Sequence, residues 1–145
     1  MSFSTPTLRL TLAQYRTMVG HCYDGLPDEA CGVLLGPMLP SGEPTGTVSE
    51  ARPCRNADAS AVTYTVHPKD LLAAMRAAEA RGEEIVGVWH SHTHTDAYPS
   101  VTDVRQAADP AWLYVIVSLR DAAPVLRAYR IRDGQISEVA VALDR

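Results

Sequence analysis

The sequence predicts an α/β (α+β) fold in which helices cover a mixed β-sheet. Helix-like and strand-like segments alternate through the first two thirds of the chain, and three strand-like segments follow one another at its end. The composition is that of an ordinary globular protein, with 145 residues, 46% hydrophobic and 21% charged. This length suits one hydrophobic core, so we expect a single domain over residues 1–145.

The N-terminal part contains a helix and a buried strand. Apolar residues at helical spacing predict a helix that begins after Thr11, a suitable N-cap, and ends near residues 25–27. Residues 30–35 form a compact apolar run, which predicts a buried strand with Glu29 at its entrance. The stretch 36–46 is rich in Pro, Gly and Ser and predicts a surface connection.

The middle of the chain adds extended segments and a second helix. Residues 47–55 predict a strand and residues 62–66 a short extended piece. Pro68 suits a first helical position and opens a helix to Arg81, which Gly82 ends. Residues 85–89 then predict an apolar strand that runs directly into His90-Ser91-His92.

The last third predicts a short helix and a meander. An irregular loop over 93–99 leads to a helix over 100–108. Strands are expected at 113–119, 125–131 and 136–143, joined by turns.

Charge and cysteine usage exclude several classes of function. The net charge is −4 without a basic run, which argues against nucleic-acid and membrane-surface partners. No apolar stretch is long enough to span a bilayer, so a cytoplasmic protein is expected. The cysteines Cys22, Cys31 and Cys54 are odd in number and scattered, which favours reduced thiols and argues against a thiolate zinc site.

Two histidines and an aspartate predict a metal site. His90 and His92 are two apart at a strand end, so they point to one face with Cα atoms roughly 6.6 Å apart. Asp103, in the first turn of the following helix, is the candidate third ligand. Two imidazoles and one carboxylate suit a single zinc ion, which lowers the pKa of a bound water to about 7.

Two further residues complete a hydrolytic site. Glu29, flanked by Pro27 and the apolar run, is the candidate acid and base that moves the proton of the attacking water. Ser100 carries a hydroxyl that can donate a hydrogen bond to the oxyanion of the attacked carbonyl.

These residues resemble the signature of the JAMM (MPN-plus) metallopeptidases. The signature consists of Glu29, then His90-Ser91-His92, seven intervening residues, Ser100, two residues and Asp103. Residues 27–34 are similar to the opening strand of the family. The resemblance implies a cytidine-deaminase-like sandwich and a zinc peptidase or isopeptidase that acts near the C-terminal tail of ubiquitin-like proteins.

A narrower resemblance is to the Mec-like peptidases of actinobacteria. Thr93 stands where the family commonly has Pro, and residues 97–100 are Ala-Tyr-Pro-Ser. This implies a ubiquitin-like sulfur carrier of the CysO or ThiS kind as the substrate, with release of cysteine in cysteine biosynthesis. Action on another ubiquitin-like modifier stays open as an alternative, and so does a homodimer.

The same residues allow other interpretations. Ser100 and Asp103 also form a capping box, and Glu29 alone would be an ordinary solvated carboxylate. Cys31 lies in an apolar strand, which argues against a cysteine nucleophile. His94 lies outside the signature and is expected to be exposed. Tyr98 could pack on a peptide tail.

Two rival functions share the fold. A non-catalytic scaffold of the same family is disfavoured by the complete ligand set. A zinc deaminase is disfavoured because the chain lacks both His-x-Glu and Pro-Cys-x-x-Cys.

Overall fold

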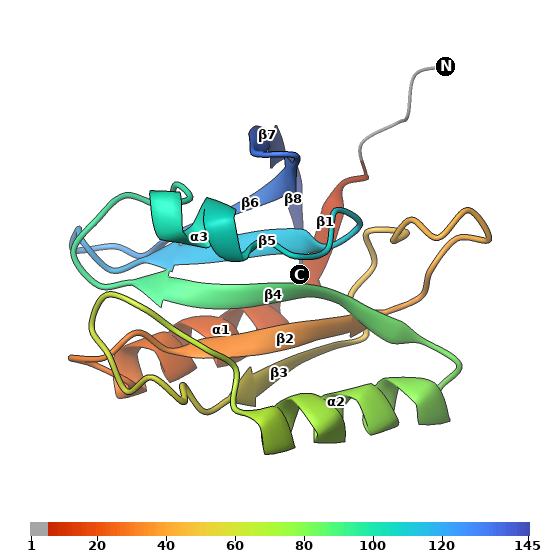
Figure 1. Cartoon of the computed structure of the whole chain (residues 1–145), viewed down its shortest axis with the longest axis horizontal. Helices are drawn as coiled ribbons and strands as arrows, with labels where there is room; N and C mark the ends of the chain where they lie inside the picture. Colours follow the sequence, from red (N-terminus) through yellow and green to blue (C-terminus); the bar gives the residue numbers. More distant parts are fainter. Residues whose placement is uncertain (1–5) are drawn as a thin grey trace.

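The computed structural model describes residues 6–145, which form eight strands and three helices (Figure 1). In chain order the elements are β1 (Leu8–Thr11), α1 (Leu12–Asp24), β2 (Cys31–Gly36), β3 (Glu50–Cys54), α2 (Pro68–Ala80), β4 (Glu84–His92), α3 (Val101–Gln106), β5 (Leu113–Ser118), β6 (Val125–Arg132), β7 (Gln135–Val139) and β8 (Val141–Asp144).

A mixed sheet of six strands forms the centre of the fold, in the order β3-β2-β4-β5-β6-β7. β4 and β5 are parallel, and every other neighbouring pair in this sheet is antiparallel. The parallel pair follows from the connection, because the chain crosses over through α3 between the two strands. The predicted mixed sheet and the C-terminal meander of β5, β6 and β7 are confirmed.

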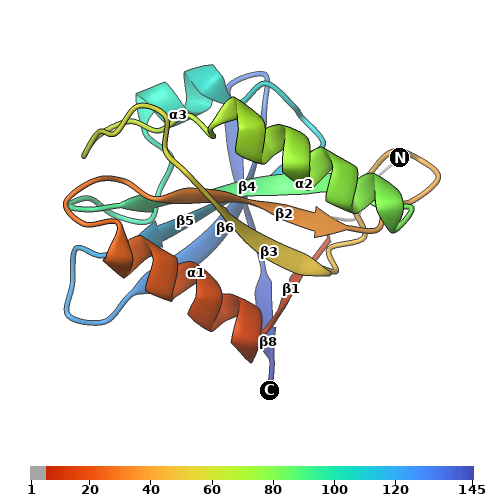
Figure 2. The same ribbon diagram turned by 90° about the horizontal axis from the view of Figure 1, so that it is seen from below.

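Helices cover both faces of the sheet. Figure 2 shows α1 against one face, with α2 and α3 on the other. β4 contributes side chains to both faces, since Trp89 packs in the core between the sheet and α1 while Val88 packs in a core on the opposite face. Side chains alternate along a strand, so the neighbours of Trp89 face α2 and α3.

Both long helices begin as their sequences predict. Thr11 caps α1 in a reciprocal capping box with Gln14, which satisfies two backbone N–H groups of the first turn. Pro68 occupies the first turn of α2, where its missing N–H costs nothing. His67 caps α2 by accepting the N–H of Lys69 through Nδ1, a structural role that its sequence neighbours do not reveal.

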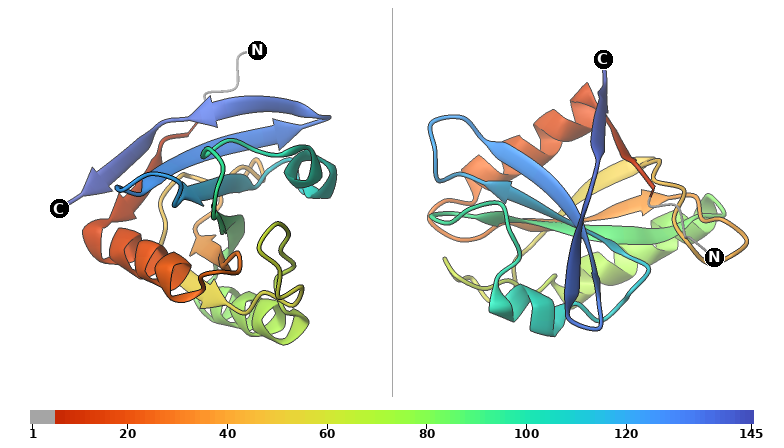
Figure 3. Two further views of the ribbon diagram at one scale, coloured as in Figure 1. Left: turned by 90° about the vertical axis from the view of Figure 1, so that its left-hand side faces the viewer. Right: turned by 90° about the horizontal axis from the view of Figure 1, so that it is seen from above.

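The two ends of the described chain differ from the prediction. The expected strand 136–143 is two strands, β7 and β8, which are separated at Ala140. β7 stays in the main sheet, whereas β8 leaves it and pairs in parallel with β1, which the sequence analysis did not predict (Figure 3). This pairing buries Leu8 and Leu10 in the core that lies against α1.

Three predicted elements are shorter or absent. The strand expected at 47–55 is limited to β3, and the helix expected at 100–108 is limited to α3. Residues 62–66 contain no strand, and only an isolated bridge joins Asn56 to Val66. A side-chain network replaces the ladder here, because the Asn56 amide donates to the carbonyls of Glu29 and Thr63. Among residues 6–145, none of the helices combines the length and apolar character needed to cross a membrane.

Candidate metal centre

β4 presents His90 and His92 on the face of the sheet that α2 and α3 cover. His90 lies between Cys31 of β2 and Ile116 of β5, and His92 lies beside Ser118 of β5. Both imidazoles are buried, with 3% and 4% of their surface exposed. The sequence predicted both histidines at the end of the strand, and the structure includes both in β4.

α3 brings Asp103 to the two imidazoles. The nitrogen Nε2 of His92 lies 2.9 Å from Asp103 Oδ2, and Nε2 of His90 lies 3.3 Å from Asp103 Oδ1. Asp103 is also the third residue of a capping box, since its Oδ2 accepts the Ser100 N–H and Ser100 Oγ accepts the Asp103 N–H. Asp103 therefore takes part in the helix cap and in the cluster at the same time, because the capping box holds its carboxylate against the histidines.

The residues of this cluster fit a bound metal ion. One ligand atom from each of His90, His92 and Asp103 lies within 4.8 Å of the other two. Nε2 of His90 is buried without a hydrogen-bond partner, although Asp103 is near, and such a nitrogen is costly unless a cation or a donor satisfies it. Two imidazoles and one carboxylate match the protein ligands of a catalytic zinc site that leaves one position open.

The three ionisable groups influence one another strongly. Burial lowers the pKa of His90, so its neutral form, the one that binds metals, is favoured. Burial also acts to lower the pKa of His92, but the Asp103 carboxylate and the Asp96 carbonyl outweigh it and raise this pKa. The neighbouring histidines outweigh the effect of burial on Asp103 and hold its pKa well below the usual range, so it is a carboxylate at neutral pH.

Glu29 lies next to this cluster but is not one of its members. Glu29 lies two residues before Cys31, the β2 partner of His90, and both His92 and Asp103 act on the charge of its carboxyl group. Its side chain is buried, and burial raises its pKa to about 7, with His92 opposing and Asp103 adding to the shift. A carboxyl group with this pKa can both take and release a proton near neutral pH.

Each histidine ring is oriented by a residue that the sequence analysis missed. Tyr64 stacks on His90 with ring centroids 4.2 Å apart and planes 21° apart. The backbone carbonyl of Asp96 lies 2.7 Å from Nδ1 of His92. Tyr64 belongs to an irregular segment, and Asp96 acts through its main chain, so neither contact leaves a signal in residue spacing.

The remaining predicted residues differ in exposure and contacts. Ser100 is exposed, and its hydroxyl accepts from Asp103 N, which leaves the hydroxyl proton free to donate. His94 is exposed, as predicted. Tyr98 is half exposed and packs edge-on against Tyr129. Cys31 is fully buried, as its place in an apolar strand predicted, and burial raises its pKa to about 12, which disfavours the thiolate form.

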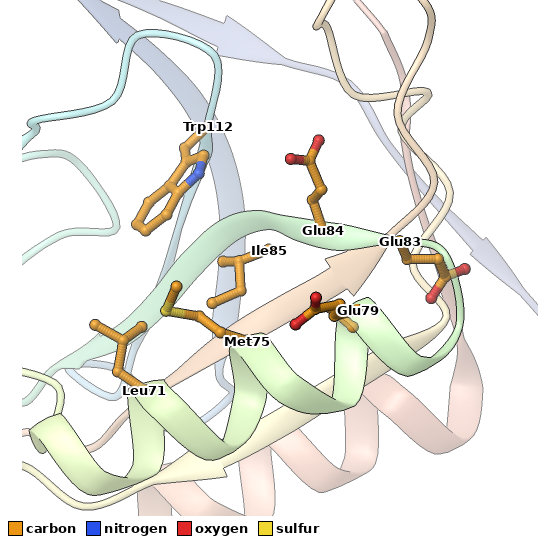
Figure 4. A pocket seen from close by; sticks show the side chains of 8 residues that line it. Leu71, Met75, Glu79, Glu83, Glu84, Ile85 and Trp112 are labelled. Atoms are coloured by element: carbon orange, nitrogen blue, oxygen red, sulfur yellow. The ribbon is translucent and has the colours of Figure 1, made fainter.

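A hollow of about 460 Å³ lies elsewhere, between α2 and the start of β4 (Figure 4). Leu71, Met75 and Trp112 line one end of it, and Glu79, Glu83 and Glu84 lie toward the other end. His90, His92 and Asp103 do not line this hollow. The chemistry described above therefore belongs to the other end of β4.

Sequence comparisons match most of the chain to known proteins. The family described as prokaryotic homologs of the JAB domain matches residues 11–132. A protein of Mycobacterium tuberculosis named CysO-cysteine peptidase is 43% identical over 125 residues, which cover 86% of this chain and 82% of that protein. A desampylase of Haloferax volcanii is 34% identical over 107 residues, which cover 70% of this chain and 73% of that protein.

Solved structures share the fold. A protein of Desulfitobacterium hafniense is similar with a TM-score of 0.83 and 31% identity, covering 94% of this chain and 92% of its own. A JAB1/MPN domain protein of Archaeoglobus fulgidus is similar with a TM-score of 0.59 and 16% identity, covering 96% and 100%. The predicted α/β (α+β) fold of the JAMM/MPN type is thus confirmed.

Proposed function

The chain belongs to the family of prokaryotic JAB-domain homologues, and on that premise we propose that it is a zinc-dependent metallopeptidase that hydrolyses the bond after the C-terminal tail of a ubiquitin-like sulfur carrier and releases cysteine. The observation that carries the proposal is the cluster of His90, His92 and Asp103 with Glu29 beside it. We propose that these three residues hold one zinc ion, which supplies Lewis acidity to the scissile carbonyl and to a water molecule.

In the proposed reaction, Glu29 moves the proton. The carboxylate takes a proton from water as the water oxygen attacks the carbonyl carbon of the last carrier residue, and later gives it to the departing amine nitrogen. A pKa near neutrality suits both steps. The free hydroxyl proton of Ser100 would donate a hydrogen bond to the oxyanion.

Similarity to a named peptidase supports the choice of substrate. The relative of Mycobacterium tuberculosis is named for a CysO-cysteine substrate and is 43% identical over most of both chains. The relative of Haloferax volcanii is named a desampylase, which supports removal of another ubiquitin-like modifier as the second candidate. Both candidates use the same catalytic residues and differ in the group that follows the scissile bond.

A mass-spectrometric cleavage assay tests the proposal. The substrates are a ubiquitin-like sulfur carrier with a C-terminal cysteine and the same carrier joined through its C-terminus to a lysine side chain. We expect the first substrate to lose the mass of one cysteine. A chelator should abolish this cleavage, and added zinc should restore it. Cleavage of the second substrate alone would favour the desampylase-like candidate.

The matched variants are Asp103→Ala, which removes a cluster residue, and Asp121→Ala, which removes an exposed carboxylate. Only Asp103→Ala is expected to be inactive. Purified protein that binds no metal and cleaves neither substrate would overturn the proposal in favour of a scaffold.

A further inference from the structure

The loop from 93 to 99 connects His92 to the cap of α3, and two buried hydroxyl groups hold its backbone. Ser118 Oγ, on β5, donates a hydrogen bond of 2.6 Å to the carbonyl of Thr95. Tyr129 Oη, on β6, donates to the carbonyl of Ala97. Ser118 is 4% exposed and Tyr129 is 1% exposed. The roles assigned above to Glu29 and Ser100 do not use either hydroxyl.

These two hydrogen bonds lie on either side of Asp96. The Asp96 carbonyl belongs to the peptide unit between Asp96 and Ala97. Because peptide units are planar, a hydrogen bond to the Thr95 carbonyl fixes the unit before it, and a hydrogen bond to the Ala97 carbonyl fixes the unit after it. With both neighbouring units held, the Asp96 carbonyl has little freedom to rotate. It accepts the N–H of Tyr98 at 2.8 Å and lies 2.7 Å from Nδ1 of His92.

The contact between Asp96 and His92 determines which ring nitrogen can bind a metal. A carbonyl oxygen only accepts hydrogen bonds, so Nδ1 of His92 carries the proton. Nε2 is then the nitrogen whose lone pair a metal can take, and it lies 2.9 Å from Asp103 Oδ2, to which it donates a proton when no metal is bound. A hydrogen bond at the far nitrogen commonly fixes both the tautomer and the direction of a metal-binding histidine.

We propose that Ser118 and Tyr129 are positioning residues for His92, because their hydroxyl groups hold the Asp96 carbonyl in the orientation that keeps Nδ1 protonated and Nε2 free for a metal. The inference rests on the proposed function only in taking His92 as a metal ligand. Arg120 strengthens the same loop from outside through an ion pair with the Asp96 side chain. That pair is exposed and contributes less than the buried hydroxyls.

The test compares two hydroxyl-deletion variants with two matched controls. Ser118→Ala and Tyr129→Phe remove the proposed contacts. Ser49→Ala removes an exposed serine hydroxyl that lies within hydrogen-bond distance of the Leu35 carbonyl and of the Glu83 carboxylate, and Tyr114→Phe removes a tyrosine hydroxyl that donates to the Asp109 carbonyl. The controls lose the same kind of bond outside the loop that carries His92.

Two measurements are made on each protein. Zinc affinity is measured by competition with a chromophoric chelator, and long-range proton–nitrogen NMR spectra of the zinc-free protein, recorded as a function of pH up to values where the ring is neutral, report which nitrogens of His92 carry a proton. We expect Ser118→Ala and Tyr129→Phe each to bind zinc roughly 10- to 100-fold more weakly than the wild type. We also expect their His92 ring signals to show a mixture of tautomers, while both controls match the wild type.

Wild-type zinc affinity together with an unchanged His92 tautomer in both variants would overturn the proposal. An equal loss of affinity in Tyr114→Phe and Tyr129→Phe would also overturn it, because general loss of stability would then be the cause. If the wild type binds no zinc, the proposed function fails, but the ring spectra still decide whether the two hydroxyls set the tautomer.

Discussion

The two histidines of the cluster are supported in different ways. His90 lies between neighbours on both adjoining strands, its ring stacks on Tyr64, and its Nε2 has no hydrogen-bond partner. His92 lies at the end of β4 and makes hydrogen bonds through both ring nitrogens, to Asp96 and Asp103. Packing therefore orients one ring, and polar contacts orient the other.

The position of each residue in the sheet explains this difference. In the middle of a ladder, neighbouring strands and covering side chains leave a ring little room to turn. His92 is as buried as His90, but the β2–β4 ladder ends at His90, so His92 has a ladder partner only in β5, and hydrogen bonds to Asp96 and Asp103 supply the orientation of its ring. Asp103 contacts both histidines, so a change there should affect both supports at once, whereas changes at Tyr64 should affect His90 alone.

Asp103→Asn is expected to have the largest effect. The amide can still serve the cap of α3 with its oxygen, but it lacks the charge that faces both histidines. Substitution of a residue that only hydrogen-bonds to a metal ligand typically weakens metal binding by up to roughly 100-fold. Asp103 is a proposed ligand itself, so the loss of zinc affinity should be larger. Calorimetric titration measures the affinity, and circular dichroism checks that the fold is retained. Unchanged zinc affinity would remove Asp103 from the ligand set.

Glu29→Gln should separate proton transfer from metal binding. The change retains the shape of the side chain and removes its basicity, so cleavage should slow by about 10²- to 10⁴-fold. Zinc content should stay at the wild-type level, because Glu29 is not a member of the cluster. Full activity in a zinc-loaded Glu29→Gln protein would exclude the proposed role.

Tyr64→Leu tests the packing of His90. Leucine fills part of the space but presents no flat face to the imidazole, so zinc should bind about 10-fold more weakly. Tyr64→Phe retains the stacking ring and serves as the matched control. The NMR signals of the His90 ring should shift in the leucine variant, while the His92 tautomer stays unchanged. NMR changes confined to the His92 ring would contradict the assignment of Tyr64 as the residue that orients His90.

The smallest effect is expected at Asp70. It is the third residue after the N-cap of α2, as Asp103 is the third residue after the N-cap of α3. Asp70 binds the exposed Arg55 through both carboxylate oxygens, and this lowers its pKa to about 2. A carboxyl group whose pKa is lower in the folded state adds stability above its unfolded pKa of about 4 and loses it as the pH falls toward 2.

Thermal unfolding of Asp70→Asn measures this contribution. At pH 7 the variant should melt a few degrees or less below the wild type, because exposed ion pairs contribute little. The difference should shrink as the pH falls from about 4 toward 2. A difference that stays constant over this range would show that the ion pair is not its source.

The sequence by itself determined the elements whose signal is local. Helical periodicity with a capping threonine predicted α1, and Pro68 predicted the start of α2. The spacing from Glu29 through the histidines to Asp103 indicated the family that the comparisons confirmed. The structure brings His90, His92 and Asp103 together, while their role as zinc ligands stays a prediction.

Only the tertiary structure decided which distant segments meet. The pairing of β1 with β8 joins the two ends of the described chain. Nothing within either segment specifies its partner, since alternation defines a buried face but not the strand beside it. The same holds for Tyr64, Ser118 and Tyr129, which reach the histidines and the loop behind them because strand register and crossovers bring separate parts of the chain together. Residue types and spacing indicate the chemistry of the site, whereas the tertiary structure of the sheet positions the groups that orient the two histidine rings.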